Sequence, residues 1–301
     1  MAAWYWCAPA APARAEGENW LIEPYLALQG GYDSNYAYHT INPLGSALAG
    51  GTAGLGASWL PSIRTRIGTR HTYTSSLNFP HGGRPDGSHY YLGTLDALYL
   101  TSLNTSVSLL GGLLDYQAPA VFQRRRTYGS WGQARFLWQP SPRFWTAFQT
   151  QWFRTCDDVL RPVITRARID HDVLARWSAG ANGPAFLRWL VHGEGMRRLS
   201  NVDGFRFRSL AGGAEITLRL WNGAETGISA SRRLRTYDAS QRYATRRVDR
   251  LDEGGALLRQ QFGEDQWLVA QGQRSVNHSR IYPYQRNWAS LTWEYAPSWL
   301  F

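Results

Sequence analysis

The sequence contains no lysine, only two cysteines and no long apolar run. All 32 of its basic residues are therefore arginines, and its formal net charge is +10. An arginine stays charged and can pair with a carboxylate or a phosphate through two bonds. No apolar stretch approaches about 18 residues, which excludes a membrane-spanning helix. The low cysteine count excludes a disulfide framework and a cysteine-based metal site.

Signals for chemistry or for nucleic-acid binding are also missing. We find no Gly-rich phosphate loop and no metal-ligand spacing. His71 and His192 share strands with other polar residues, but the sequence does not place a serine beside either of them, as a catalytic Ser–His pair would require. We therefore expect no catalytic residues, no cofactor, no metal and no enzyme activity. The arginines are spread along the chain instead of forming one basic helix or patch, so nucleic acid is not expected as a partner.

The N-terminal residues 1–15 resemble an incomplete secretion signal. Ala13-Arg14-Ala15 is a small-residue cleavage pattern, although the segment is short and has no positively charged beginning. The alternative is a short disordered arm. No linker or helical repeat follows, so we expect residues 16–301 to form a single domain.

Large side chains recur at every second position at the C-terminus. Trp293, Tyr295, Trp299 and Phe301 share one parity, which Pro297 interrupts, and small or polar residues occupy the other. A period of two indicates a strand with two unlike faces. An aromatic outer face suits the lipid side and interface of an outer-membrane barrel. The sequence therefore predicts an all-β, transmembrane, antiparallel up-and-down β-barrel. A soluble β-sandwich or barrel is the alternative.

Connections of two kinds alternate along the chain. Turn chemistry appears at 60–62, 101–102, 139–142, 180–184, 221–223 and 263–265. Longer polar connections are predicted at 33–47, 76–88, 116–126, 156–163, 195–204, 236–246 and 276–284. Bacterial barrels have short periplasmic turns and long outer loops. The pattern predicts about 14 strands, with 12 to 16 within the error of the boundaries, and both termini in the periplasm.

Seven tryptophans lie within a few residues of a predicted short turn or of the C-terminus. Tryptophan prefers the membrane–water interface, so this placement predicts a girdle at that end of the barrel. The residues are Trp59, Trp138, Trp145, Trp177, Trp221, Trp267 and Trp299.

Parity also predicts which charges face the lumen. Arg64, Arg66 and Arg70 alternate with isoleucines, and Arg286 and Glu294 lie opposite the aromatic face of the last strand. A charge on the lipid face costs about 2–4 kcal/mol at the midplane, so these residues are the lumen-lining candidates. Weaker candidates for the same wall, and further countercharges, are Arg206, Arg208, Arg232, Arg250, Gln260, Glu194 and Asp252. Such a lumen favours anions. The alternative is a network of ion pairs that only fills and braces the barrel.

Two segments resemble a known family. Pro24 to Leu28 with Gly31 to Asn35, and Asn277 to Asn287 with the terminal Phe301, resemble the first and last strands of porin-like outer-membrane barrels. These include the C-terminal barrel of surface lipoprotein assembly modifiers. The resemblance implies a 14-stranded barrel in the outer membrane of a Gram-negative bacterium. It also implies that the barrel assembly machinery recognises the C-terminal signal, whose residues are Trp293, Tyr295, Trp299 and Phe301.

The leading functional hypothesis is a porin-like or export conduit with an arginine-rich lumen. One alternative is the barrel part of a surface lipoprotein assembly or secretion factor, whose helical-repeat domain is missing from this chain. A second alternative is a plugged structural or receptor barrel. Expected partners are outer-membrane lipid and lipopolysaccharide, the barrel assembly machinery, and anionic solutes, exported polymer or lipoproteins. The run Arg124-Arg125-Arg126 is either an ordinary solvated loop or a contact for lipopolysaccharide phosphates.

Overall fold

The computed structural model describes most of the chain, in segments separated by connections. The described residues are 19–35, 45–81, 83, 85–117, 126–158, 167–183, 186–202, 204–221, 223–238, 247–280 and 283–300. The predicted signal at 1–15, the arginines 124 and 125, and Phe301 lie outside them. Among the described residues, no helix is long and apolar enough to cross a membrane.

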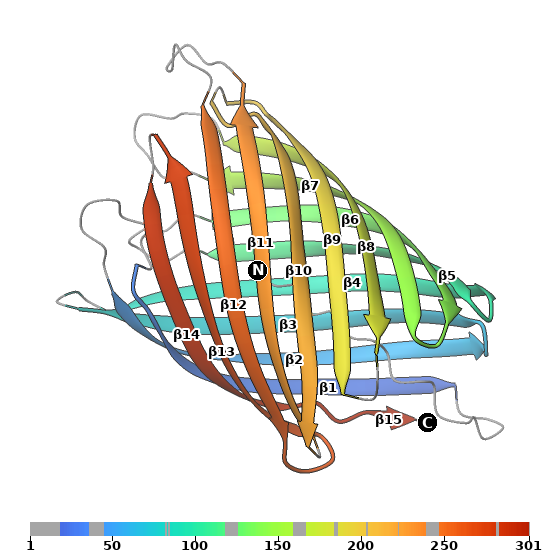
Figure 1. The fold of residues 1–301 in the computed structure, drawn as a ribbon. Helices are drawn as coiled ribbons and strands as arrows, with labels where there is room; N and C mark the ends of the chain where they lie inside the picture. Colours follow the sequence, from blue (N-terminus) through green and yellow to red (C-terminus); the bar gives the residue numbers. More distant parts are fainter. Residues whose placement is uncertain are drawn as a thin grey trace.

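The described part of the chain consists of β-strands and their connections (Figure 1). The strands are β1 (Trp20–Asp33), β2 (Ser46–Ser62), β3 (Thr65–Pro80), β4 (Asp86–Ser102), β5 (Thr105–Gln117), β6 (Arg126–Ser141), β7 (Phe144–Asp158), β8 (Arg168–Asn182), β9 (Leu187–Ser200), β10 (Phe207–Trp221), β11 (Ala224–Tyr237), β12 (Val248–Gln261), β13 (Gln266–Ser279), β14 (Tyr284–Tyr295) and β15 (Trp299–Leu300).

The strands β1 to β14 form one closed antiparallel barrel. Each strand pairs with the next in the chain, and β14 pairs with β1 from Leu26↔Tyr295 to Asp33↔Trp288. Closure leaves no free sheet edge, so the wall satisfies its own backbone hydrogen bonds. This confirms the predicted up-and-down barrel and the count of 14 wall strands.

The C-terminal residues continue the seam between β14 and β1. β14 ends at Tyr295, two residues before Pro297, which has no backbone donor for the ladder. The two-residue strand β15 then pairs with β1 through Ile22↔Trp299, in the same register as Leu26↔Tyr295. Trp299 therefore shares a face with Tyr295 across the proline, as the aromatic period predicts.

The two kinds of connection define the two ends of the barrel. Tight turns follow β2, β4, β6, β8, β10 and β12, and the chain also enters β1 and leaves β14 at this end, which we call the turn end. The other seven connections lie at the opposite, loop end. Three of these are clearly shorter than predicted, at 81–85, 201–206 and 280–283, because β3, β9 and β13 continue further than turn chemistry suggests.

Alternation gives the wall two unlike faces. One parity carries the exposed large apolar residues, such as Leu95, Leu113 and Leu210, which are 64%, 64% and 70% exposed. The other parity carries most of the buried polar groups, including Asp33, Asp170 and Thr292. A wall that is apolar outside and polar inside is the arrangement of a transmembrane barrel.

The predicted tryptophan girdle is right in part. Trp59, Trp138, Trp177, Trp221 and Trp299 are exposed on the outer face. Trp145 and Trp267 have the inward parity instead, since they pair with Gly180 and Glu294. Trp145 occupies the space over Gly180, which has no side chain, and the Arg259 guanidinium lies 3.8 Å from the ring centroid of Trp267. Distance from a turn predicts the height of a tryptophan but not its face.

Candidate functional site in the barrel lumen

The inward face of the wall carries both arginines and carboxylates. Following the strand register from Glu23, Tyr25 and Asp33 of β1 around the barrel assigns one parity of every strand to the lumen. On this face lie Arg66, Arg70, Arg135, Arg168, Arg176, Arg188, Arg198, Arg219, Arg233, Arg235, Arg259 and Arg286, together with Glu23, Asp33, Asp86, Asp96, Asp157, Asp170, Asp172, Glu194, Glu215, Glu225, Asp249, Glu253 and Glu294.

Near the turn end, Arg70 of β3 reaches across β2 to Glu23 of β1. The Arg70 Nη2 to Glu23 Oε2 distance is 3.1 Å. Gly56 of β2 lies between them, and a Cβ built there would lie 3.3 Å from the Arg70 Nε and 3.4 Å from the Glu23 Cβ. Because Gly56 has no side chain, an ion pair can form between β1 and β3, which are not neighbours in the sheet. Arg66, also on β3, pairs with Asp96 of β4 at 3.1 Å.

The Arg70–Glu23 pair remains accessible although it points inward. The two side chains are 42% and 29% exposed. The neighbouring inward positions of β2 are small, namely Gly50, Thr52, Gly54, Gly56 and Ser58. At the height of the Arg70–Glu23 pair, the side chains of the described residues therefore leave the inner surface of the wall accessible to solvent.

Glu294 belongs to a second group at the turn end. Its Oε2 lies 3.6 Å from Arg259 Nη2, and the Tyr25 hydroxyl hydrogen bonds to its carboxylate. Arg259 in turn stacks on Trp267. Contributions from β1, β12, β13 and β14 therefore meet across the closing seam of the barrel.

Near the loop end, the charges form a longer chain. Asp170 and Asp172 alternate along β8, and Arg198 of β9 donates from Nε and Nη2 to Asp172 at 2.7 and 2.5 Å. The Arg198 Nη1 also lies 3.4 Å from Asp170, which Arg168 Nε approaches at 3.1 Å. Arg168 pairs further with Asp157 of β7. A run of carboxylates and guanidinium groups thus links three strands.

At the seam itself, Asp33 and Arg286 form a compact pair. The Arg286 Nε and Nη2 donate to Asp33 Oδ2 at 2.8 and 2.5 Å, and the backbone N–H of Asn35 donates to Asp33 Oδ1 at 3.0 Å. Asp33 is 4% exposed. In the middle of the wall, Glu194 lies 3.6 Å from Arg176 and 3.3 Å from Arg233.

The residues that the sequence proposed for the lumen fall in several places. Arg66, Arg70, Arg286 and Glu294 have the inward parity and are each ion-paired, and Glu194 joins them. Arg64 lies in the exposed two-residue turn between β2 and β3, because β2 runs on to Ser62 through an irregularity after Trp59. The weaker candidates differ: Arg206 precedes β10, whereas Arg208, Arg232, Arg250, Gln260 and Asp252 have the outward parity.

The chain of charges near the loop end was missed by sequence reasoning. Its signal was present in the alternation of Asp170 and Asp172 with Ile169 and His171, since two carboxylates on one parity must share the polar face. As a whole, guanidinium groups and carboxylates lie side by side over the described inner wall. The surface is therefore mixed in sign, and its local fields largely cancel.

The sequence matches no protein-family model and no curated relative. Solved structures of similar fold are outer-membrane barrels. OmpT of Vibrio cholerae lacking loop L8 gives a TM-score of 0.55 at 7% identity, covering 93% of this chain and 100% of that one. A bacterial polysaccharide outer membrane secretin gives 0.51 at 12%, covering 91% and 97%. The Pseudomonas putida toluene transporter TodX gives 0.51 at 6%, covering 92% and 89%.

At these identities, the likeness concerns the fold. The resemblance noted in the sequence therefore extends to the outer-membrane barrel architecture, and the narrower likeness to surface lipoprotein assembly modifiers stays a hypothesis. Closure, an apolar outer face and a polar inner face are the physical requirements of a barrel in lipid. The chain is a 14-stranded outer-membrane β-barrel of a Gram-negative bacterium.

Proposed function

We propose that the barrel is a conduit for small polar solutes across the outer membrane. The observation that carries this proposal is the inward-facing Arg70–Glu23 pair, which keeps 42% and 29% of its side-chain surface exposed. A wall that only filled the interior would bury such a pair. The similar fold of a toluene transporter and a polysaccharide secretin supports the idea that this architecture accommodates transport.

The mixed charge of the wall suggests which solutes pass. Arg66, Arg70, Arg286 and Glu294 would line the passage, and Arg64 would lie at its turn-end mouth. Because the inward arginines lie near carboxylates, the wall offers donors and acceptors together without a strong field of one sign. Neutral and zwitterionic solutes should therefore pass about as well as small anions.

The orientation and assembly route complete the proposal. Short turns would face the periplasm, with both ends of the wall there, as is usual for bacterial barrels. The barrel assembly machinery would recognise a signal formed by Trp293, Tyr295, Trp299 and Phe301. The first three of these residues lie along the seam where the barrel closes.

A liposome-swelling assay tests the conduit. Purified barrel in vesicles is diluted into an isotonic solution of a neutral sugar, a zwitterionic amino acid or a small organic anion. We expect swelling with all three, at rates that follow solute size more closely than charge. Vesicles that hold folded barrel but swell no faster than empty ones would contradict the proposal.

A further inference from the structure

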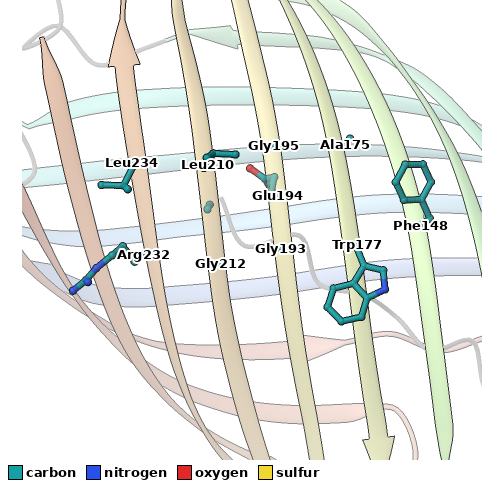
Figure 2. Close-up of a pocket in the computed structure, with 11 residues that line it drawn as sticks. Phe148, Ala175, Trp177, Gly193, Glu194, Gly195, Leu210, Gly212, Arg232 and Leu234 are labelled. Carbon is teal, nitrogen blue, oxygen red and sulfur yellow. The ribbon is translucent and has the colours of Figure 1, made fainter. Parts of the chain in front are cut away.

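The outer face of the barrel has a depression over β7 to β11. Phe148 and Trp177 lie on one side and Leu210 and Leu234 on the other, with Gly193 and Gly195 between them (Figure 2). Its volume is about 610 Å³. The flanking side chains are exposed by 43% to 70%, so the depression opens toward lipid.

Glycine creates this depression. A Cβ built on Gly193 would meet no atom within 4 Å, and one built on Gly195 would meet only Leu210 Cδ2, at 3.9 Å. These glycines are therefore not required by close backbone packing. They leave a groove in the wall that a flexible apolar chain can occupy.

Two arginines face outward directly above the groove, on its loop-end side. Arg197 follows Gly195 by two residues on β9, Arg208 precedes Leu210 by two residues on β10, and the two are register partners. Two residues of strand span about 6.6–6.8 Å. Both arginines are exposed, and neither makes a hydrogen bond or an ion pair with any residue that the structure describes. Like charges directly opposite each other destabilise a sheet unless a counterion lies between them.

The height of this pair matches the boundary of the membrane. The outward positions of β9 are uncharged from Leu187 to Gly195, and those of β10 from Leu220 to Leu210. A transmembrane strand needs about 9–11 residues to cross the hydrocarbon. Both stretches fill this length, so the arginines lie where lipid headgroups begin.

A third arginine lies at the edge of the depression. Arg232 lines it from β11 and donates from Nε to Asp252 at 2.7 Å, and the same carboxylate lies 3.3 Å from Arg250. Asp252 therefore neutralises only part of this neighbouring group, and the outer wall beside the groove keeps an excess of positive charge.

We propose that this surface binds one phosphorylated lipid, with an acyl chain in the Gly193–Gly195 groove and a headgroup phosphate between Arg197 and Arg208. Charge selects the phosphate, since guanidinium groups bind phosphate oxygens through paired hydrogen bonds. The groove selects a lipid over free phosphate, since a chain can bury apolar surface only if it is attached to the headgroup. The ligand belongs to the leaflet at the loop end.

Native mass spectrometry of the full barrel in detergent tests this site. The probes are bisphosphorylated lipid A, the same lipid with its phosphates removed, and inorganic phosphate as competitor. The variants are R197Q/R208Q, which removes the charge, and G193L, which fills the groove. R274Q is the matched control, because Arg274 is an exposed outward arginine on β13. Heat-modifiable mobility on gels reports the fold of each variant.

We expect wild type and R274Q to retain bisphosphorylated lipid A, and R197Q/R208Q and G193L to retain about tenfold less. The dephosphorylated lipid should be retained as weakly by wild type as by R197Q/R208Q, and inorganic phosphate should not displace lipid A. Retention of both lipids to the same extent would overturn the proposal, as would equal losses in R274Q and R197Q/R208Q or displacement by inorganic phosphate. If R197Q/R208Q does not fold, R197K/R208K replaces it, because this variant keeps the charge. R197K/R208K should lose less retention of bisphosphorylated lipid A than G193L does, and a larger loss than that of G193L would also overturn the proposal.

Discussion

The seam between β1 and β14 should depend on one ion pair. Replacing Asp33 by Asn keeps an oxygen for the Asn35 amide but removes the charge that receives two bonds from Arg286, at 2.8 and 2.5 Å. Asp33 is nearly buried and the Arg286 side chain is 28% exposed. The substitution would leave a guanidinium without its counterion at a site with limited access to water.

The expected cost follows from the strength of such contacts. Hydrogen bonds to charged groups contribute about 1.5–3 kcal/mol, and the partial exposure of Arg286 places the expected loss near the middle, at about 2 kcal/mol. Reversible urea unfolding of the barrel in lipid vesicles measures it. The control is D158N, since Asp158 is exposed at the loop end of β7.

A double-mutant cycle separates the pair from its surroundings. If Asp33 and Arg286 stabilise each other, R286Q should cost a similar amount, and D33N/R286Q should cost clearly less than the two single changes added together. Additive costs would show that Asp33 and Arg286 do not stabilise each other. So would a loss below about 0.5 kcal/mol for D33N, because surface substitutions typically fall in that range.

Three further changes test the wall. G56L should push Arg70 away from its carboxylate partner, because even a Cβ there lies 3.3 Å from the Arg70 Nε; bilayer reversal potentials should shift toward anions, and an unchanged potential would argue against the pair. L113R should lower the unfolding free energy in vesicles by about 2–4 kcal/mol more than L114R, since the two neighbours lie on opposite faces; equal losses would contradict the assigned faces. I63C, in a cysteine-free background, should react with an impermeant maleimide only after the outer membrane is opened; labelling of intact cells would reverse the proposed orientation.

The fold was largely predictable because its signals are local. Alternation along Trp293 and Tyr295 gives the face of the last strand, and alternating connections give the strand count without knowledge of long-range contacts. Strand ends were harder to predict, because side-chain chemistry does not mark where pairing stops. The Leu60-Pro61-Ser62 segment has turn composition, yet it remains in β2 and the turn forms at Ile63 and Arg64.

The inner wall was predictable only where parity was unambiguous. Arg66 and Arg70 alternate with Ile67 in an uninterrupted strand, so their face follows from the sequence. In Arg232-Arg233, adjacent arginines must face opposite sides, and only the register of β11 against β10 assigns Arg233 to the lumen. Which charges pair across strands also depends on register, which single-sequence patterns do not contain.

Single-channel recording in a planar bilayer tests the conduit proposal most directly. We expect stable current steps, with a reversal potential near zero in a salt gradient because the lumen charges are mixed. The double substitution E23Q/E294Q should move that potential toward anion selectivity, since it leaves Arg70 and Arg259 without the carboxylates at 3.1 and 3.6 Å. A folded, heat-modifiable barrel that carries no current would contradict the proposal that the barrel is a conduit.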